Sequence, residues 1–132
     1  MAAMTVEVVS PERVLFSGEA TMVITRTQGG GEIAFLPGHA PFLGSLTENH
    51  TRVFLVDGST IDIAVHSGFV EVSNSKVSIL SDVAELGADI DVQRAQAARA
   101  RAEERMRHDA DAEATAALNR ATARLRAAGV SV

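Results

Sequence analysis

The sequence predicts an α+β fold that is mostly β, with an N-terminal β-sandwich in residues 1–87 and a C-terminal antiparallel two-helix hairpin in residues 88–132. In the first part, short apolar and β-branched runs recur with turn residues between them, as in sandwiches and barrels. From Asp89 onward the chain is rich in Ala and Arg, without Pro and without Gly before Gly129. Because Ala and Arg are strong helix formers, the second part is expected to be helical.

The strands of the sandwich follow from period-two alternation and from turn signals. Ile61 and Ile63 alternate with Asp62, which is the pattern of a half-buried strand. The pairs Asp57-Gly58 and Asn74-Ser75 fit compact hairpin turns. We expect strands at residues 5–9, 20–27, 32–36, 51–56, 59–65, 69–73 and 76–81, with two further short ones at residues 15–17 and 44–46.

A loop with the sequence LPGHAPFLG is expected between two of these strands, at residues 36–44. Its two prolines each fix one backbone angle, and its glycines reach angles closed to other residues. We therefore predict a rigid loop with His39 at its apex and with Phe42 and Leu43 turned back toward the core.

The helices are expected at residues 91–107 and 112–128, with a short polar break between them. Asp89 or Asp91 can cap the first helix, and Gly129 ends the second. The expected apolar stripes are Val92, Ala95, Ala98, Ala102 and Met106 in the first helix, and Ala114, Ala117, Leu118, Ala121, Leu125 and Ala128 in the second. Since alanine buries little apolar area, the hairpin is either a weakly held, mobile element or a permanently docked tail.

Composition and charge exclude several classes of protein. The chain has no cysteine, and so no disulfide and no thiolate nucleophile. No apolar run approaches the ~18 residues of a membrane span, and the first residues lack the layout of a signal peptide, so membrane association is expected only through a partner. Residues 1–86 carry a net charge of −6, which argues against nucleic acid as a partner.

No catalytic site and no metal site are recognisable in the sequence. The run Gly29-Gly30-Gly31 lacks the Lys-Ser/Thr pair of a phosphate-binding P-loop and precedes a strand, so it is expected to be a hairpin tip with Glu32 exposed beside it. The four histidines lack the spacing of metal ligands. His39 is either a loop histidine bonded to nearby backbone or a contact residue on an interface.

Arginines follow the apolar stripes of both helices. Arg94, Arg101 and Arg105 are spaced by seven and four residues, and Arg124 borders the second stripe. Guanidinium groups beside an apolar groove can hold a phosphate chain, because each offers a planar fork of donors. Alternatively, they form a solvated basic flank balanced by the acidic residues of the same helices.

Four motifs resemble one known family in register over almost the whole chain. They are VSPERVLFSGEA at residues 9–20, GEIAFLPGHAPFLG at 31–44, GFVEVS at 68–73 and IDVQRA at 90–95. Together they are similar to the ε subunits of bacterial F-type proton-translocating ATP synthases. The resemblance implies a non-catalytic subunit of the central stalk. Such a subunit couples proton-driven rotation of the c-ring to ATP synthesis and inhibits ATP hydrolysis through its C-terminal helices.

The same resemblance implies partners and a location. The partners are the γ subunit, the polar loops of the c-ring and, through the C-terminal helices, the catalytic α/β head. The location is the cytoplasmic face of the bacterial cell membrane, peripherally, as part of the complex. Glu32 is implied to face the c-ring, and His39, with Pro41 and Phe42, is implied to lie at an interface with γ or the ring.

The segment IDVQRA resembles the I/L-D-x-x-R-A pattern by which some bacterial ε subunits bind ATP. The candidate nucleotide-binding residues are therefore Ile90, Asp91, Arg94 and Ala95, with Glu85 just upstream and with Arg101 and Arg124 as additions from outside the motif. No cofactor is required, and ATP is expected only as a regulatory ligand. The alternative function is a free-standing adenine nucleotide-sensing module with the sandwich as its scaffold.

Overall fold

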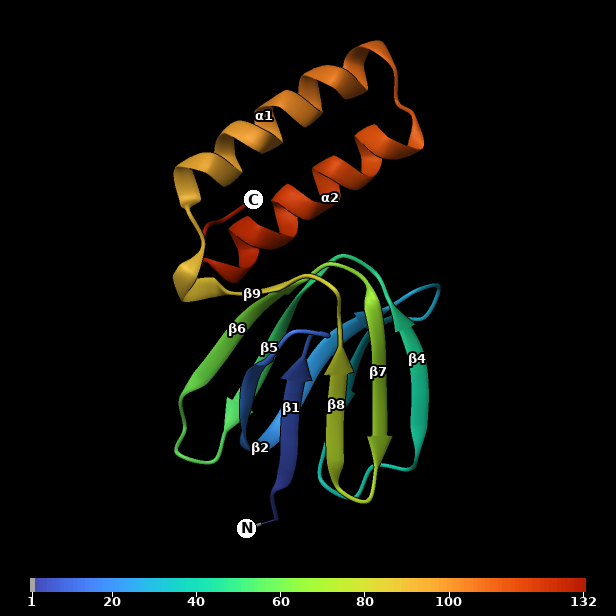
Figure 1. Cartoon of the computed structure of the whole chain (residues 1–132), viewed down its shortest axis with the longest axis vertical. Helices are drawn as coiled ribbons and strands as arrows, with labels where there is room; N and C mark the ends of the chain where they lie inside the picture. The colour runs from blue at the N-terminus through green and yellow to red at the C-terminus, as the bar shows by residue number, and fades with distance from the viewer. Residues whose placement is uncertain (1) are drawn as a thin grey trace.

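The computed structural model describes residues 2–132 as a two-layered β-sandwich with a helical hairpin at one end (Figure 1). The predicted architecture is confirmed. Its elements, in chain order, are β1 (Met4–Val9), β2 (Val14–Thr27), β3 (Gly31–Phe35), β4 (Phe42–Leu46), β5 (Asn49–Leu55), β6 (Thr60–Val65), β7 (Gly68–Ser73), β8 (Lys76–Leu80), β9 (Ala84–Leu86), the 3₁₀ turn η1 (Gly87–Asp89), α1 (Val92–His108) and α2 (Ala112–Ala127).

The long strand β2 belongs to both layers of the sandwich. Its first half pairs with β1, which continues through β8 and β7 to β4, and its second half pairs with β3 and with β5, which continues through β6 to β9. The sequence predicted two separate strands here, at residues 15–17 and 20–27, and this was wrong. Gly18 stays in register with Val6, and the ring of Phe16 covers it, 3.0 Å from the place of a Cβ atom.

The core between the layers is built from β-branched and large apolar side chains. Its fully buried members include Met4, Val23, Phe35, Leu46 and Ile63. Such interiors are packed as densely as organic crystals and deform little. The sandwich is therefore a stiff body to which other elements attach.

The loop between β3 and β4 is anchored by aromatic contacts. The His39 ring lies edge-on to Phe35, with centroids 4.9 Å apart, and its Nδ1 atom is 2.7 Å from the carbonyl oxygen of Ala40. Phe42 packs against Phe35 at 5.4 Å, as expected. Leu43, however, is 70% exposed. The expectation for Leu43 was wrong because β4 begins at Phe42, and successive side chains of a strand point to opposite faces.

The ends of the helices agree with their capping residues. Asp91 accepts a hydrogen bond from the backbone N–H of Arg94, and Asp111 accepts one from that of Ala114. After α2, Gly129 has a φ of +85°, and the N–H of Val130 bonds to the carbonyl of Leu125 at 2.9 Å. This is a Schellman motif, which ends the helix at the predicted glycine.

The hairpin docks on the sandwich through α2, which packs against β5 and β6. Of the predicted stripe, α2 buries Ala114, Ala121 and Leu125, and it also buries Ala123 and Ala127. Ala116, Ala123 and Ala127 repeat at spacings of seven and four, so the sequence contains the pattern of a second alanine stripe on this helix. The chain reaches α1 through β9, which pairs with β6, and η1, neither of which was expected.

Gly87, the first residue of η1, lies directly against the end of α2. A Cβ atom on Gly87 would be 2.1 Å from the carbonyl oxygen of Ala127 and 3.1 Å from that of Asp62. Both obstacles are backbone atoms, so neither can move aside as a flexible side chain would. A side chain at this position is incompatible with the docked hairpin.

We expect Gly87→Ala to weaken docking and to lower the free energy of unfolding by about 1–3 kcal/mol, the usual cost of overpacking. Urea denaturation followed by circular dichroism measures this loss. The matched control is Ala88→Ser at the next, exposed position, which should cost little. Equal stability of the two variants would contradict the role of the Gly87 contact.

Candidate functional site

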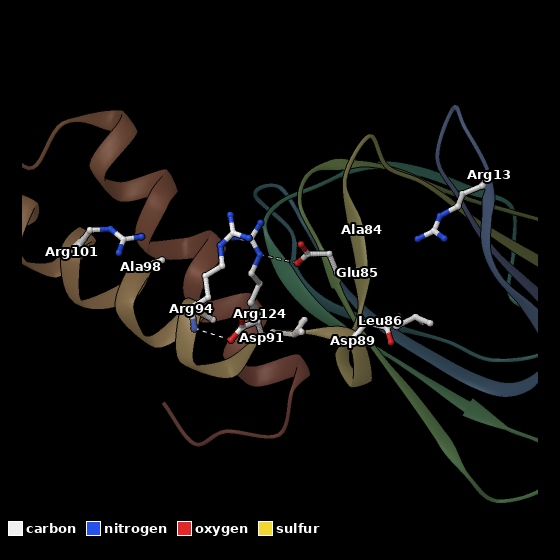
Figure 2. A pocket seen from close by; sticks show the side chains of 12 residues that line it. Arg13, Ala84, Glu85, Leu86, Asp89, Asp91, Arg94, Ala98, Arg101 and Arg124 are labelled. Carbon is white, nitrogen blue, oxygen red and sulfur yellow. Dashed lines mark hydrogen bonds and ion pairs between the residues drawn. The ribbon is translucent and has the colours of Figure 1, made fainter.

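A cleft of about 480 Å³ lies where β9 and η1 meet the helical hairpin (Figure 2). Its wall comes from the turn before β2, from β9, from η1 and the chain that follows it, from one face of α1 and from Arg124 of α2. The lining residues are Arg13, Ala84, Glu85, Leu86, Asp89, Ile90, Asp91, Arg94, Ala95, Ala98, Arg101 and Arg124.

All seven residues singled out in the sequence as candidates for nucleotide binding line this cleft. They are Glu85 in β9, Ile90 and Asp91 before α1, Arg94, Ala95 and Arg101 in α1, and Arg124 in α2. The remaining lining residues, Arg13, Ala84, Leu86, Asp89 and Ala98, were not among the candidates for this site. Ala98 lies four residues after Arg94 on the same helix face, so periodicity can find it, whereas Arg13 is distant in sequence and carries no local signal.

One ion pair joins the sandwich to the hairpin across the cleft. Nε of Arg124 donates to Oε2 of Glu85 at 2.7 Å, as the dashed line in Figure 2 marks. Nε2 of His66 lies 3.4 Å from the same oxygen. Burial raises the pKa of Glu85, but the hydrogen bonds and charges of Arg124 and His66 lower it by more, so its pKa lies below the usual 4.5. Glu85 is therefore ionised at neutral pH.

Besides Arg124, the cleft contains guanidinium groups that stay available to a ligand. Among residues 2–132, no carboxylate forms an ion pair with Arg94 or Arg101. Arg105, the third arginine of that predicted row, turns to Asp111 at 3.1 Å instead. In Figure 2, Arg94 extends toward Arg124, and Arg101 follows further along α1. Unpaired guanidinium groups in a concave site attract an anionic ligand.

The rest of the cleft wall is apolar. Leu86, Ile90, Ala95 and Ala98 contribute aliphatic surface beside the arginines. Pockets of this mixed kind bind ligands that have an apolar part and a few polar groups at fixed places. An apolar ring that carries an anionic chain has the chemistry that this cleft complements.

The four candidate interface residues lie outside the cleft. Glu32 is exposed on β3 opposite Arg26 and lines a separate polar groove that also includes residues of α2. His39, Pro41 and Phe42 lie together on and beside the β3–β4 loop, where Pro41 is exposed and the rings of His39 and Phe42 are 6.4 Å apart.

Two negative findings apply to the described part of the chain. In residues 2–132, no group of three His, Cys, Asp or Glu side chains is placed to hold a metal ion. No helix in that range has the length and apolar character needed to cross a membrane.

Two family models match the chain in succession. The ATP synthase delta/epsilon chain β-sandwich domain matches residues 3–87, and the delta/epsilon long alpha-helix domain matches residues 88–129. A β-sandwich that carries a helical hairpin is thus the architecture of a class of rotary ATP synthase subunits. The chain belongs to the delta/epsilon chain family of ATP synthases.

Its curated relatives are epsilon chains of bacteria. The ATP synthase epsilon chain of Streptomyces griseus is 43% identical over 129 residues, which cover 98% of each chain. That of Brevibacillus brevis is 48% identical over 98 residues, which cover 74% of each. The predicted resemblance, and with it a non-catalytic ε subunit of the ATP synthase central stalk, is confirmed.

Solved structures agree on the fold. A chain in the mitochondrial ATP synthase of Euglena gracilis superposes with a TM-score of 0.74 at 19% identity, covering 95% of this chain and 76% of that one. One in the central stalk and c-ring of the Tetrahymena thermophila enzyme gives 0.56 at 14% identity, with 71% and 70% covered.

We expect Arg124→Gln to lower the free energy of unfolding at pH 7 by about 1 kcal/mol, after allowance for solvent screening of a partly exposed pair. Because the pKa of Glu85 is depressed, the pair stabilises above pH 4.5, and its contribution is lost as the pH falls through that depressed value. Urea denaturation at pH 7 and well below pH 4.5 measures the difference in unfolding free energy between variant and wild type.

Arg126→Gln is the matched control for this test, since Arg126 is an exposed arginine in the last turn of the same helix. It should change stability little at either pH. A deficit of Arg124→Gln that is equally large at pH 7 and well below pH 4.5 would show that Glu85 is not the partner that matters.

Proposed function

We propose that this subunit couples c-ring rotation to the catalytic head through its sandwich, and that its hairpin is a brake on ATP hydrolysis controlled by nucleotide. The docked hairpin permits hydrolysis, and the extended hairpin blocks it. The observation that carries this proposal is the arginine-lined cleft, which exists only where β9, α1 and α2 meet.

The ligand that the cleft supports best is ATP. Arg94 and Arg101 offer unpaired guanidinium groups for a phosphate chain, and Arg124, which is paired with Glu85, adds a third guanidinium group to the cleft. Ile90 and Ala95 supply an apolar surface for the adenine ring, beside the backbone at the start of α1. Asp91 fixes that start by capping the helix, so its role in the site is to position its neighbours.

Binding at this cleft would favour the docked hairpin. A ligand that contacts β9 and both helices loses most of its contacts when the helices leave the sandwich. Such differential affinity shifts the equilibrium toward the binding-competent form, by about 2.7 kcal/mol at a ligand concentration of 100 Kd. Without ATP, the freed helices and their arginines can reach along γ to acidic surfaces of the α/β head.

The surface of the sandwich supports the proposed stalk partners. Phe69 and Leu80 lie opposite each other on β7 and β8, and Leu43 lies on the neighbouring β4. All three are exposed, and an exposed apolar group of this kind is typical of a protein interface. We assign it to γ, and the exposed Glu32 beside the β2–β3 tip to the polar c-ring loops. These contacts would hold the chain peripherally at the cytoplasmic face of the cell membrane.

We expect the isolated chain to bind ATP, and Arg94→Ala to weaken this binding at least about tenfold, because a charge-assisted hydrogen bond contributes about 1.5–3 kcal/mol. Isothermal titration calorimetry at low salt measures both affinities. Arg107→Ala is the matched control, since Arg107 is exposed on the same helix outside the cleft. No ATP binding by the wild type, or equal binding by the two variants, would refute the nucleotide site.

We expect removal of residues 88–132 to raise ATP hydrolysis by the assembled enzyme several-fold at low ATP, since the blocking element is then absent. Steady-state ATPase assays of purified complexes measure this. Retention of the truncated chain and of γ in the complex, checked on gels, is the control for assembly. Unchanged hydrolysis in complexes that retain both would overturn the brake.

A further inference from the structure

His66 is a buried histidine at the point where the sandwich meets the hairpin. It follows β6 directly, and its side chain is only 4% exposed. Its Nε2 atom is 3.4 Å from Oε2 of Glu85, the oxygen that Arg124 also contacts at 2.7 Å. Its Nδ1 atom is buried without a hydrogen-bond partner among the described residues. Neither the ligand cleft nor the sandwich core accounts for a histidine in this place.

The charged groups that act on His66 come from three elements. Arg124 approaches from α2, Glu85 from β9, and Glu48 from the turn between β4 and β5. Burial lowers the pKa of His66, and the charge of Arg124 lowers it further. Glu85 and Glu48 oppose this effect without cancelling it, so the pKa of His66 lies below its ordinary 6.5. In the docked state the imidazole is therefore neutral at physiological pH.

Undocking of the hairpin would change two of these influences at once. Arg124 leaves with α2, which packs against β6, so the imidazole loses a repelling charge and gains access to water. Glu85 stays, because it belongs to β9 and pairs in register with Ala64 of β6. Glu85 thus exchanges one cationic partner, Arg124, for another, the protonated His66.

We propose that His66, Glu85 and Arg124 form an acid-sensitive latch, in which protonation of His66 releases Arg124 and the hairpin undocks. This inference rests on the proposed function only in taking the hairpin as the mobile regulatory element. It adds a second input, the pH of the surrounding compartment. Acidification would then favour the extended hairpin, and with it the inhibition of ATP hydrolysis.

The direction of the effect follows from linkage. The docked form binds the proton of His66 more weakly than the undocked form would, because burial and the charge of Arg124 lower the pKa of His66 while the hairpin is docked. Docking is therefore strongest above pH 6.5 and weakens as the pH falls below it. One site changes the docking equilibrium by at most about tenfold for each unit by which its pKa differs between the two forms.

The absence of cysteine from the chain makes the test direct. Ser45→Cys on β4 and Ala100→Cys on α1 place spin labels at two exposed positions, one on each part of the molecule. Electron double resonance then reports the distance between sandwich and hairpin from pH 8 to pH 5.5, without nucleotide. We expect a second, longer distance to grow several-fold in population below pH 6.5. Glu85 stays ionised over this range, since its pKa is below 4.5.

Two histidine variants separate the latch from a general effect of acid. His66→Gln should abolish the growth of the long distance. His50→Gln should retain it, because His50, also near α2, bonds to Asp62 rather than to Glu85 or Arg124. A pH-independent wild type, or a response that survives in His66→Gln, would overturn the latch.

A second measurement covers the case in which His66→Gln does not fold. The imidazole of His66 is titrated by NMR in the unlabelled wild-type chain, and its midpoint must agree with that of the distance change. Different midpoints would refute the proposal. The experiments contain no ATP, so their outcome does not depend on whether the nucleotide site exists. A hairpin that does not respond to pH would refute the latch even if the chain binds ATP.

Discussion

The docking of α2 on β5 and β6 is the contact on which the rest of the structure depends. It brings Glu85 of β9 together with Arg94 and Arg101 of α1 and Arg124 of α2, so the cleft exists only while the contact holds. The contact is close because Gly87 has no side chain between η1 and the carbonyl of Ala127. A site assembled from both parts of the chain is intrinsically sensitive to their separation.

The two parts differ in how firmly they are built. The sandwich buries large side chains such as Phe35 and Leu46 between layers that share β2, whereas the buried residues of α2 are alanines apart from Leu125. Burial stabilises by about 25 cal/mol per Å² of apolar area, and alanine offers little of it. Among residues 2–132, Glu85–Arg124 is the ion pair that joins α2 to the sandwich, so part of the docking free energy depends on charge. Docking that depends on charge responds to ligands and protons, which a purely apolar contact would not do.

The sequence predicted what local chemistry determines and missed what distant segments determine. Asp91 and Gly129 mark helix ends through hydrogen bonds within a few residues; Gly129 was predicted, and Asp91 was one of the two candidates for the first cap. The continuity of β2 through Gly18 depends on pairing with β1 and on the Phe16 ring, which no local signal reveals. In the cleft, the residues near the IDVQRA segment were found by motif and spacing. The place of Arg13 in the cleft and the pairing of Arg124 with Glu85 could not be predicted locally, because these residues are far apart in the sequence and meet only in the folded chain.

Glu85 is the residue at which the two proposed inputs meet. Its carboxylate holds Arg124 in the ligand-free docked form, and Arg124 also lines the cleft in which a phosphate chain would bind. By reciprocity of binding free energies, nucleotide and acid would act on the same equilibrium through one carboxylate. The two inputs would oppose each other, because nucleotide would favour the docked hairpin and a proton on His66 the undocked one, and both Arg124 and His66 lie at the same oxygen of Glu85.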